Sequence, residues 1–202
     1  MDKIVVVVDR SGSMDLIKSD AEGGVNSFIN EQKEIGEAEL TFVEFDENYD
    51  MLAENVNIKE FKEYKLVPRG MTALFDAIGR TANAVKDSNV TGKKIFVVVT
   101  DGQENRSTEW KNASAISSLI SEMRENKWEF IFIGSDEKSL SEAKSLGMDM
   151  GKAFSFGGTS RGISDSYDAV SVYATSFRSG ASSEEADKKL ADIVSSSSTL
   201  KQ

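Results

Sequence analysis

The sequence predicts a single α/β domain whose doubly wound, Rossmann-like sheet is mostly parallel, has one antiparallel edge strand and carries helices on both faces. Residues 4–8 and 95–99 are β-branched apolar runs without polar alternation, a pattern typical of central strands in a parallel sheet. Stretches with helical periodicity separate the strand-like runs, and this alternation favours a parallel sheet with right-handed crossovers. The 202 residues suit one well-buried core.

Four further segments complete the expected sheet. Residues 128–134 read as a third parallel strand, and residues 152–156 as a weaker, peripheral one. Residues 40–45 and 51–58 are strand-like, and the polar residues 46–50 between them have the composition of a hairpin turn. We therefore expect an antiparallel pair at one edge of the sheet.

Five stretches have apolar residues at helical spacing. They contain, in chain order, Val25 and Phe28, Leu74 and Ile78, Ile116 and Ile120, Leu140 and Ala143, and Ile163 and Val170. Gly23 and Gly24 lie inside the first of these stretches, and each costs about 1 kcal/mol relative to alanine in a helix interior. We expect close packing on the sheet to offset that cost.

The composition changes near the C-terminus. Residues 1–178 contain all the expected strands and the five periodic stretches, so we assign them to the domain. Residues 179–202 are rich in serine and charged residues. We expect them to form a loosely attached tail with a short helix near residues 184–194.

Charge and residue usage exclude several classes of function. The formal net charge is −10, from 24 Lys and Arg against 34 Asp and Glu, which disfavours nucleic acid and anionic lipid surfaces and favours cations. Histidine and cysteine are both absent, so a Ser-His-Asp triad, a Cys-His pair and a thiolate zinc site are excluded.

Targeting signals are not evident either. The apolar run at residues 4–8 is too short for the core of a signal peptide, and no stretch approaches the roughly 20 apolar residues of a membrane span. We expect a cytoplasmic protein that binds neither nucleic acid nor membranes.

Hydroxyl and carboxylate side chains follow the two central strands. Asp9, Ser11 and Ser13 follow the first strand, Asp101 follows the second, and Thr72 precedes the helix between them. Ligands of doubly wound sheets bind beyond the carboxyl ends of the strands, so we expect these five side chains to converge. A set of oxygen ligands suits a hard cation, above all Mg²⁺.

These residues also carry a family resemblance. The pattern Asp9-x-Ser11-x-Ser13, the Gly-x-Thr-Ala-Leu segment at residues 70–74 and the sequence Thr-Asp-Gly at 100–102 resemble the metal-ion-dependent adhesion site (MIDAS) of von Willebrand factor type A (VWA) domains. A lone Asp-x-Ser-x-Ser pattern is weak, but all three parts in the family's order are specific.

The resemblance implies a role for each residue and a function. Ser11, Ser13 and Thr72 would be hydroxyl ligands, with Asp9 and Asp101 close to the metal, often through water. Mg²⁺ would be the cofactor, with Mn²⁺ or Ca²⁺ as substitutes. The domain would be a protein-interaction module rather than an enzyme, capturing an Asp or Glu of a partner such as an ATPase or a macromolecular assembly. In the family, the last helix can shift when ligand binds.

Two other interpretations of the acidic residues stay open. Asp9 and Asp101 could merely cap helices at strand ends. Alternatively, Asp9 could be the nucleophile of a Mg²⁺-dependent phosphohydrolase of the haloacid dehalogenase type, although that chemistry needs an acid two residues later, where this chain has Ser11.

Other polar residues are not assigned to the site. Asp46-x-Asn48-x-Asp50 mimics the start of a calcium loop, but Met51 and Asn57 stand where that loop needs Gly and Glu. We interpret this segment as a solvated hairpin turn. Glu104 and Asn105 are interpreted as loop surface rather than ligands.

Overall fold

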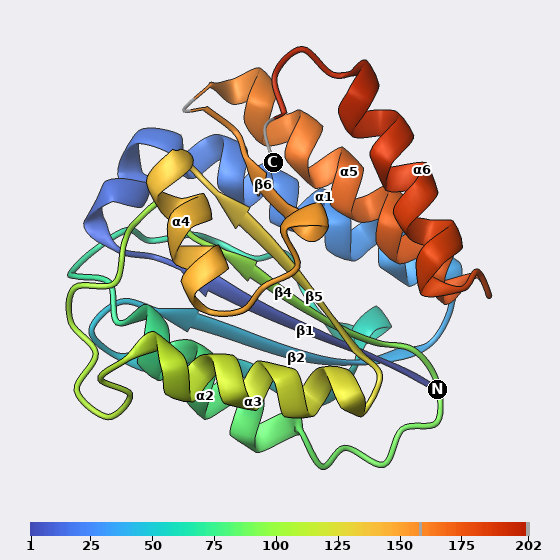
Figure 1. Ribbon diagram of the computed structural model, residues 1–202, viewed down its shortest axis with the longest axis horizontal. Coiled ribbons are helices and arrows are strands. Elements are labelled where there is room, and N and C mark those ends of the chain that lie inside the picture. The colour runs from blue at the N-terminus through green and yellow to red at the C-terminus, as the bar shows by residue number, and fades with distance from the viewer. Residues whose placement is uncertain (158, 201–202) are drawn as a thin grey trace.

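The architecture is a six-stranded sheet with helices on both faces, seen in a computed structural model that describes residues 1–157 and 159–200 (Figure 1). The strand order is β3-β2-β1-β4-β5-β6. The strands are β1 (Asp2–Asp9), β2 (Ala38–Phe45), β3 (Tyr49–Asn57), β4 (Lys94–Val99), β5 (Trp128–Gly134) and β6 (Ala153–Ser155). Among the strands of the described residues, only β2 and β3 pair antiparallel. The predicted fold class is confirmed, including the antiparallel hairpin at one edge.

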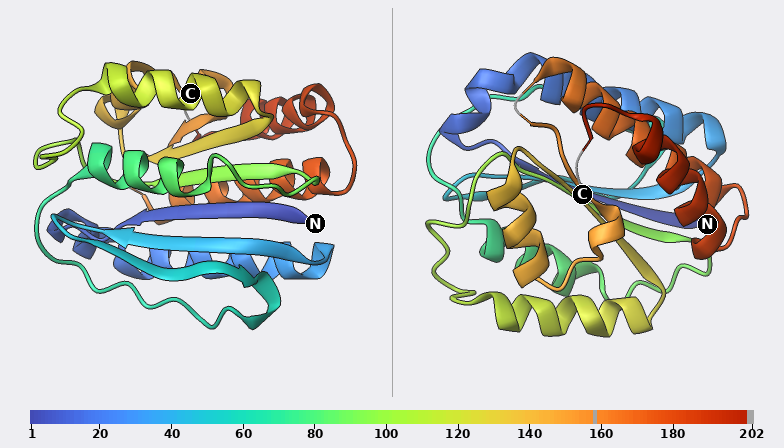
Figure 2. Two further views of the ribbon diagram at one scale, coloured as in Figure 1. Left: turned by 90° about the horizontal axis from the view of Figure 1, so that it is seen from below. Right: turned by 45° about the horizontal axis from the view of Figure 1, so that its top comes forward.

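Helices cover the two faces of the sheet in separate layers (Figures 1 and 2). Helices α1, α5 and α6 pack on one face, and α2, α3 and α4 on the other. The helices are α1 (Lys18–Ile35), α2 (Leu74–Val85), α3 (Ala113–Glu125), α4 (Glu137–Ser145), α5 (Ser160–Arg178) and α6 (Ser183–Ser196), with short 3-10 helices η1 (Gly12–Ile17), η2 (Ile58–Glu60) and η3 (Met150–Lys152). The five periodic stretches of the sequence all lie on the helices α1 to α5.

The central position of β1 explains its unbroken apolar run. Ile4, Val6 and Val8 face the layer of α1 and α5. Val5 and Val7 face α2 and α3. All five are at most 1% exposed, and full burial of such a side chain stabilises the fold by about 1.5–3 kcal/mol. Because β1 is buried on both faces, the residue at its end is also placed inside the protein.

Gly24 allows helices α1 and α5 to approach each other closely. A Cβ atom on Gly24 would lie 2.1 Å from a ring carbon of Tyr167 on α5, whereas a Cβ on Gly23 would have no neighbour within 4 Å. The predicted close packing at this glycine pair therefore involves Gly24 only, and its partner is a helix rather than the sheet.

The C-terminal segment is more closely packed than expected. Helix α6 begins with a capping box between Ser182 and Glu185 and buries Ala186 and Leu190 against the rest of the core. Lys152 Nζ also pairs with Asp187 of α6 at 3.2 Å. The predicted helix is present and longer than expected, and it is not loosely attached, because its apolar stripe completes one layer of the core.

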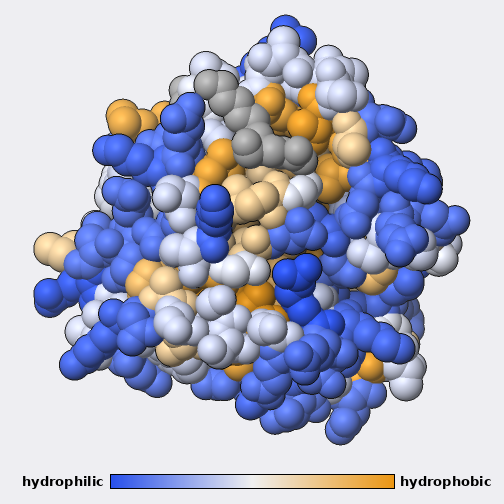
Figure 3. Space-filling view, viewed as in Figure 1, coloured by the Kyte–Doolittle hydropathy of each residue, from blue (hydrophilic) through white to orange (hydrophobic). Residues whose placement is uncertain are grey.

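The surface seen in Figure 3 is mostly hydrophilic, with hydrophobic residues in separate patches. Within the described part of the chain, no helix has both the length and the apolar character needed to cross a bilayer.

The glycine pair in α1 gives a matched test of this packing. We expect Gly23→Ala to raise the free energy of unfolding by about 0.5–1 kcal/mol, because alanine restricts the unfolded chain and favours helix. Gly24→Ala should lower it by about 1–3 kcal/mol, since the added methyl overlaps the buried ring of Tyr167. Urea denaturation measures both changes. Equal stabilisation by the two substitutions would contradict the proposed contact.

Candidate metal centre

Three loops meet beyond the carboxyl ends of β1 and β4, at the left of Figure 1. The backbone N–H of Gly12 donates to the carbonyl of Gly70 over 3.1 Å, which joins the loop after β1 to the loop before α2. Ser13 Oγ donates to Asp101 Oδ1 over 2.6 Å, which joins the loop after β1 to the loop after β4.

Thr72 closes the third side of this arrangement. Its hydroxyl lies 2.9 Å from the position that a Cβ atom on Gly102 would occupy, and an oxygen of Asp9 lies 3.5 Å from the same point. Because Gly102 has no side chain, the space between the Thr72 hydroxyl and the Asp9 carboxylate stays open. The structure brings together the five residues selected from the sequence, while their role as metal ligands stays a prediction.

Asp9 is the most buried carboxylate of the site, with 0% exposure. Its Oδ1 accepts the N–H of Ser11 over 2.6 Å, and its Oδ2 accepts the hydroxyl of Thr100 over 2.5 Å. Burial raises the pKa of Asp9 to about 6, and the nearby charge of Asp101 adds to the rise, although the hydrogen bonds from Thr100 and Ser11 oppose it. The negative charge of Asp9 is only partly compensated by protein groups.

The other four residues of the site range in solvent exposure from buried to exposed. Ser11 and Thr72 are 2% and 3% exposed, Asp101 is half-buried and Ser13 is exposed. The hydroxyls of Ser11 and Ser13 lie 3.2 Å apart. Burial also raises the pKa of the Asp101 carboxyl.

The composition of this set decides which metals fit. The five residues supply two carboxylates and three hydroxyls. In the described residues, no group of three or more Asp, Glu, His or Cys side chains is gathered for a metal. These hard oxygen donors fit a divalent cation such as Mg²⁺, which would also supply the positive charge that Asp9 lacks.

Hydrogen bonds from the strand ends hold the site loops in place. Thr100, the first residue after β4, is fully buried. Its hydroxyl also accepts the N–H of Gly102 over 3.1 Å. The hydroxyl of Ser135, the first residue after β5, donates to the carbonyl of Asp101 over 2.7 Å. Neighbouring strands therefore fix the loop that carries Asp101.

Glu104 and Asn105 hold the Thr72 segment, a role that the sequence analysis missed. The N–H of Thr72 donates to Asn105 Oδ1, and the N–H of Asn105 donates to the carbonyl of Thr72, both over 3.0 Å. The carboxylate of Glu104 accepts the N–H of Phe75 over 2.8 Å. Neither residue was predicted as a ligand, and both prove to be loop-organising residues. Their position just after Asp101 was the only available signal.

The hairpin between β2 and β3 also differs from its prediction in one respect. The turn is present, but Asp46 is only 1% exposed rather than solvated, because its Oδ2 accepts from Arg10 Nε over 2.9 Å and from Arg69 Nε over 2.8 Å. Burial alone would raise the pKa of Asp46, but the hydrogen bonds from Arg69, Asn48 and Arg10 outweigh it and lower the pKa to about 2.

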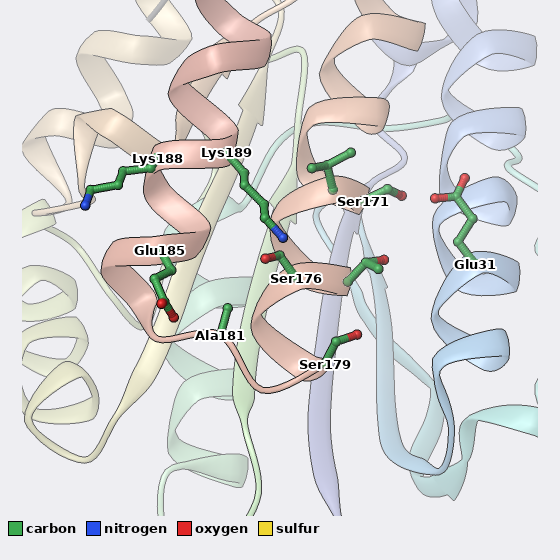
Figure 4. A pocket seen from close by; sticks show the side chains of 10 residues that line it. Glu31, Ser171, Ser176, Ser179, Ala181, Glu185, Lys188 and Lys189 are labelled. Carbon is green, nitrogen blue, oxygen red and sulfur yellow. The ribbon is translucent and has the colours of Figure 1, made fainter.

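A groove of the molecule lies away from this site. It is bordered by α1, α5 and α6, with Glu31 on one side, Lys188 and Lys189 on the other, and small side chains such as Ser171 between them (Figure 4). The end of α5 returns to the start of β1, where Arg178 Nε donates to Asp2 Oδ2 over 2.8 Å. The groove therefore flanks the half of the sheet opposite to the candidate site.

Comparison with known proteins identifies the fold. No protein-family profile matches the sequence, and a search of curated proteins gives no match. Among solved structures, a von Willebrand factor type A protein from Catenulispora acidiphila is similar, with a TM-score of 0.61, 17% identity, and coverage of 86% of this chain and 42% of that one. The vWF domain of the type V pili tip protein Mfa5 from Porphyromonas gingivalis has a TM-score of 0.66, 12% identity, and coverage of 91% and 98%.

A third similar structure is proximal thread matrix protein 1 from the mussel byssus with a zinc-occupied MIDAS motif. Its TM-score is 0.57 and its identity 18%, with coverage of 84% of this chain and 46% of that one. The chain spans less than half the length of the byssus and Catenulispora proteins. The chain has the fold of von Willebrand factor type A domains.

Because the charge of Asp9 is only partly compensated, we expect its removal by mutation to stabilise the metal-free protein. Because burial raises the pKa of Asp9 from 3.8 to about 6, its contribution to stability falls as pH rises from about 4 to 6. In EDTA at pH 7, the free energy of unfolding of Asp9→Asn should exceed that of the unchanged protein by at most about 3 kcal/mol.

Below pH 4 this difference should vanish, because Asp9 is then protonated. Urea denaturation at several pH values measures it. A variant that is less stable in EDTA at pH 7 would show that the hydrogen bonds already satisfy the carboxylate.

Proposed function

We propose that this domain is a metal-dependent protein-interaction module. Asp9, Ser11, Ser13, Thr72 and Asp101 would hold Mg²⁺, which captures an Asp or Glu side chain of a partner protein. The observation that carries the proposal is the convergence of three hydroxyls and the Asp101 carboxylate on a buried Asp9 whose charge is only partly compensated. Mn²⁺ and Ca²⁺ are possible substitutes for Mg²⁺.

The proposed ligands suit a metal that binds a partner's carboxylate better than a metal that is enclosed by the protein's own carboxylates. When bound, the metal would supply a positive centre for a carboxylate oxygen. Ser11, Ser13 and Thr72 are neutral donors, so they leave more of that charge available than a cage of carboxylates would. Asp9, which accepts the hydrogen bonds of Thr100 and Ser11, would balance part of that charge.

The exposure of the residues indicates the direction of approach. Asp9, Ser11 and Thr72 are buried and form the floor of the site. Ser13 is exposed and Asp101 is half-buried, so they border its open side. A partner's carboxylate would therefore enter beside Ser13 and Asp101.

Two comparisons support the proposal. The zinc-occupied MIDAS motif of the byssus protein makes a divalent metal plausible for the matching residues here, and the vWF domain of a pili tip protein fits a role in interaction or assembly. The chain has no histidine, and Ser11 stands where a phosphohydrolase of the haloacid dehalogenase type needs an acid. We therefore propose a non-enzymatic module. We keep as proposals the expectations from the sequence that the module is cytoplasmic and that its partner is an ATPase or a larger assembly.

The metal site predicts stabilisation by divalent cations. Mg²⁺ or Mn²⁺ should raise the melting temperature, because a ligand that binds only the folded state stabilises it, by about 2.7 kcal/mol at 100 times Kd. Asp101→Ala should remove most of this increase while leaving the fold intact, since Asp101 lies on a loop outside the core. Differential scanning calorimetry with Mg²⁺ and with EDTA measures the change.

An equal Mg²⁺ effect in the variant would show that Asp101 is not part of the site. Mg²⁺-dependent hydrolysis of p-nitrophenyl phosphate that Asp9→Asn abolishes would support the phosphohydrolase instead.

Partner capture should require both the metal and the open side of the site. We expect affinity capture from the source cells to recover a partner in Mg²⁺ that EDTA releases, and Ser13→Ala to weaken that recovery. Substitution of each exposed Asp and Glu of the recovered partner by Asn or Gln should identify one carboxylate that is essential. A partner that is retained equally in EDTA, or that binds without any such carboxylate, would contradict the proposed mode of recognition.

A further inference from the structure

The carboxylate of Asp46 links the loops that carry the proposed ligands. Asp46 directly follows β2 and is almost completely buried. Its Oδ2 accepts from Arg10 Nε, and Arg10 stands between Asp9 and Ser11 in the chain. The same Oδ2 accepts from Arg69 Nε, on the segment that leads to Thr72.

Backbone bonds reinforce these side-chain contacts. The carbonyl of Asp46 accepts the N–H of Ala73, the residue after Thr72, over 3.0 Å. The N–H of Arg69 donates to the carbonyl of Arg10 over 2.7 Å, and the N–H of Arg10 donates to the carbonyl of Phe45 over 2.8 Å. Three separate segments are thus tied to one another around one carboxylate.

Asp46 has no oxygen left to offer a metal. Its Oδ1 accepts both the backbone N–H of Asn48, over 2.5 Å, and the Nδ2 group of Asn48, over 2.9 Å. With Arg10 and Arg69 on Oδ2, four donors occupy the carboxylate. Any effect of Asp46 on a metal must therefore act through the loops that it connects.

We propose that Asp46 is a positioning residue of the metal centre, whose carboxylate sets the placement of the Thr72 segment relative to the loop of Asp9, Ser11 and Ser13. This inference rests on the proposed metal site, but the joining of the loops can be tested without metal. Without the charge of Asp46, the anion that Arg10 and Arg69 still share would be the half-exposed carboxylate of Asp50. Water screens an exposed ion pair, so the two loops would be held together less firmly.

The chain provides two matched control carboxylates. Asp2 also accepts from an arginine Nε and from a backbone N–H, those of Arg178 and Lys93, but it lies at the other end of β1. Asp50 accepts from Arg10 Nη2 over 2.5 Å and is half exposed. Asp2→Asn therefore controls for loss of a partly buried ion pair. Asp50→Asn controls for loss of an exposed charge that pairs with the same two arginines as Asp46.

The first measurement is hydrogen exchange of the backbone amides in EDTA. In Asp46→Asn, the amides of Arg69 and Ala73 should exchange faster, because their acceptors lie on the segments that Asp46 joins. In Asp2→Asn, the exchange rates of these two amides should change no more than the variant's free energy of unfolding accounts for. Unchanged rates in folded Asp46→Asn would overturn the inference, whether or not the protein binds a metal.

The second measurement is a double-mutant cycle read by calorimetric titration with Mg²⁺ alone. Asp46→Asn should weaken Mg²⁺ binding about 10- to 100-fold, as loss of outer-shell partners typically does. Asp2→Asn and Asp50→Asn should change it little. Thr72→Ala should weaken binding in the unchanged protein but have a much smaller effect in the Asp46→Asn background, since contacts that act together are not additive.

The outcomes separate the two claims. Failure of the unchanged protein to bind Mg²⁺ would refute the proposed metal site and leave the exchange rates to decide the role of Asp46 in joining the loops. Binding of Mg²⁺ with equal affinity in folded Asp46→Asn, or fully additive effects of Asp46→Asn and Thr72→Ala, would refute the positioning role and leave the metal site standing.

Discussion

The burial of the Asp9 carboxylate is the constraint on which the site depends. β1 is one of the two central strands of the sheet and is covered by helices on both faces, and the residue that ends it, Asp9, is 0% exposed. A buried carboxylate needs hydrogen bonds and positive charge. Thr100 and Ser11 supply the first. A bound metal would add the second, so under the proposed function the burial of Asp9 would favour cation binding.

Asp9 and Arg10, consecutive charged residues at the end of β1, bond to the loops on the two sides of the site. Asp9 is bonded to Thr100, which follows β4, whereas Arg10 is bonded to Glu44 and Asp46 of the β2 hairpin. β4 and β2 flank β1 on opposite sides, so one strand end anchors both neighbouring loops. A buried ion pair need not add stability, but removal of one partner leaves an uncompensated charge. This penalty favours a single arrangement of the loops, which is what a site built from three separate segments requires.

The sequence predicted those features that leave a regular or local pattern. The unbroken apolar runs identified the central strands, and the order of Asp9, Ser11, Ser13, Thr72 and Asp101 along a doubly wound fold predicted their convergence. The roles of Asp46 and Asn105 could not be predicted, because each acts on residues 23 to 36 positions away through side-chain contacts that have no periodicity. The docking of α6 was missed for a related reason: its serine-rich composition hides a short apolar stripe of Ala186 and Leu190.

The central claim is that a divalent cation binds among the three loops at the ends of β1 and β4. Anomalous X-ray scattering from crystals of the unchanged protein grown with Mn²⁺ tests it most directly. We expect one strong peak within bonding distance of the hydroxyls of Ser11, Ser13 and Thr72, close to Asp9 and Asp101. A strong peak at another place on the molecule, or no peak at saturating Mn²⁺, would contradict the account.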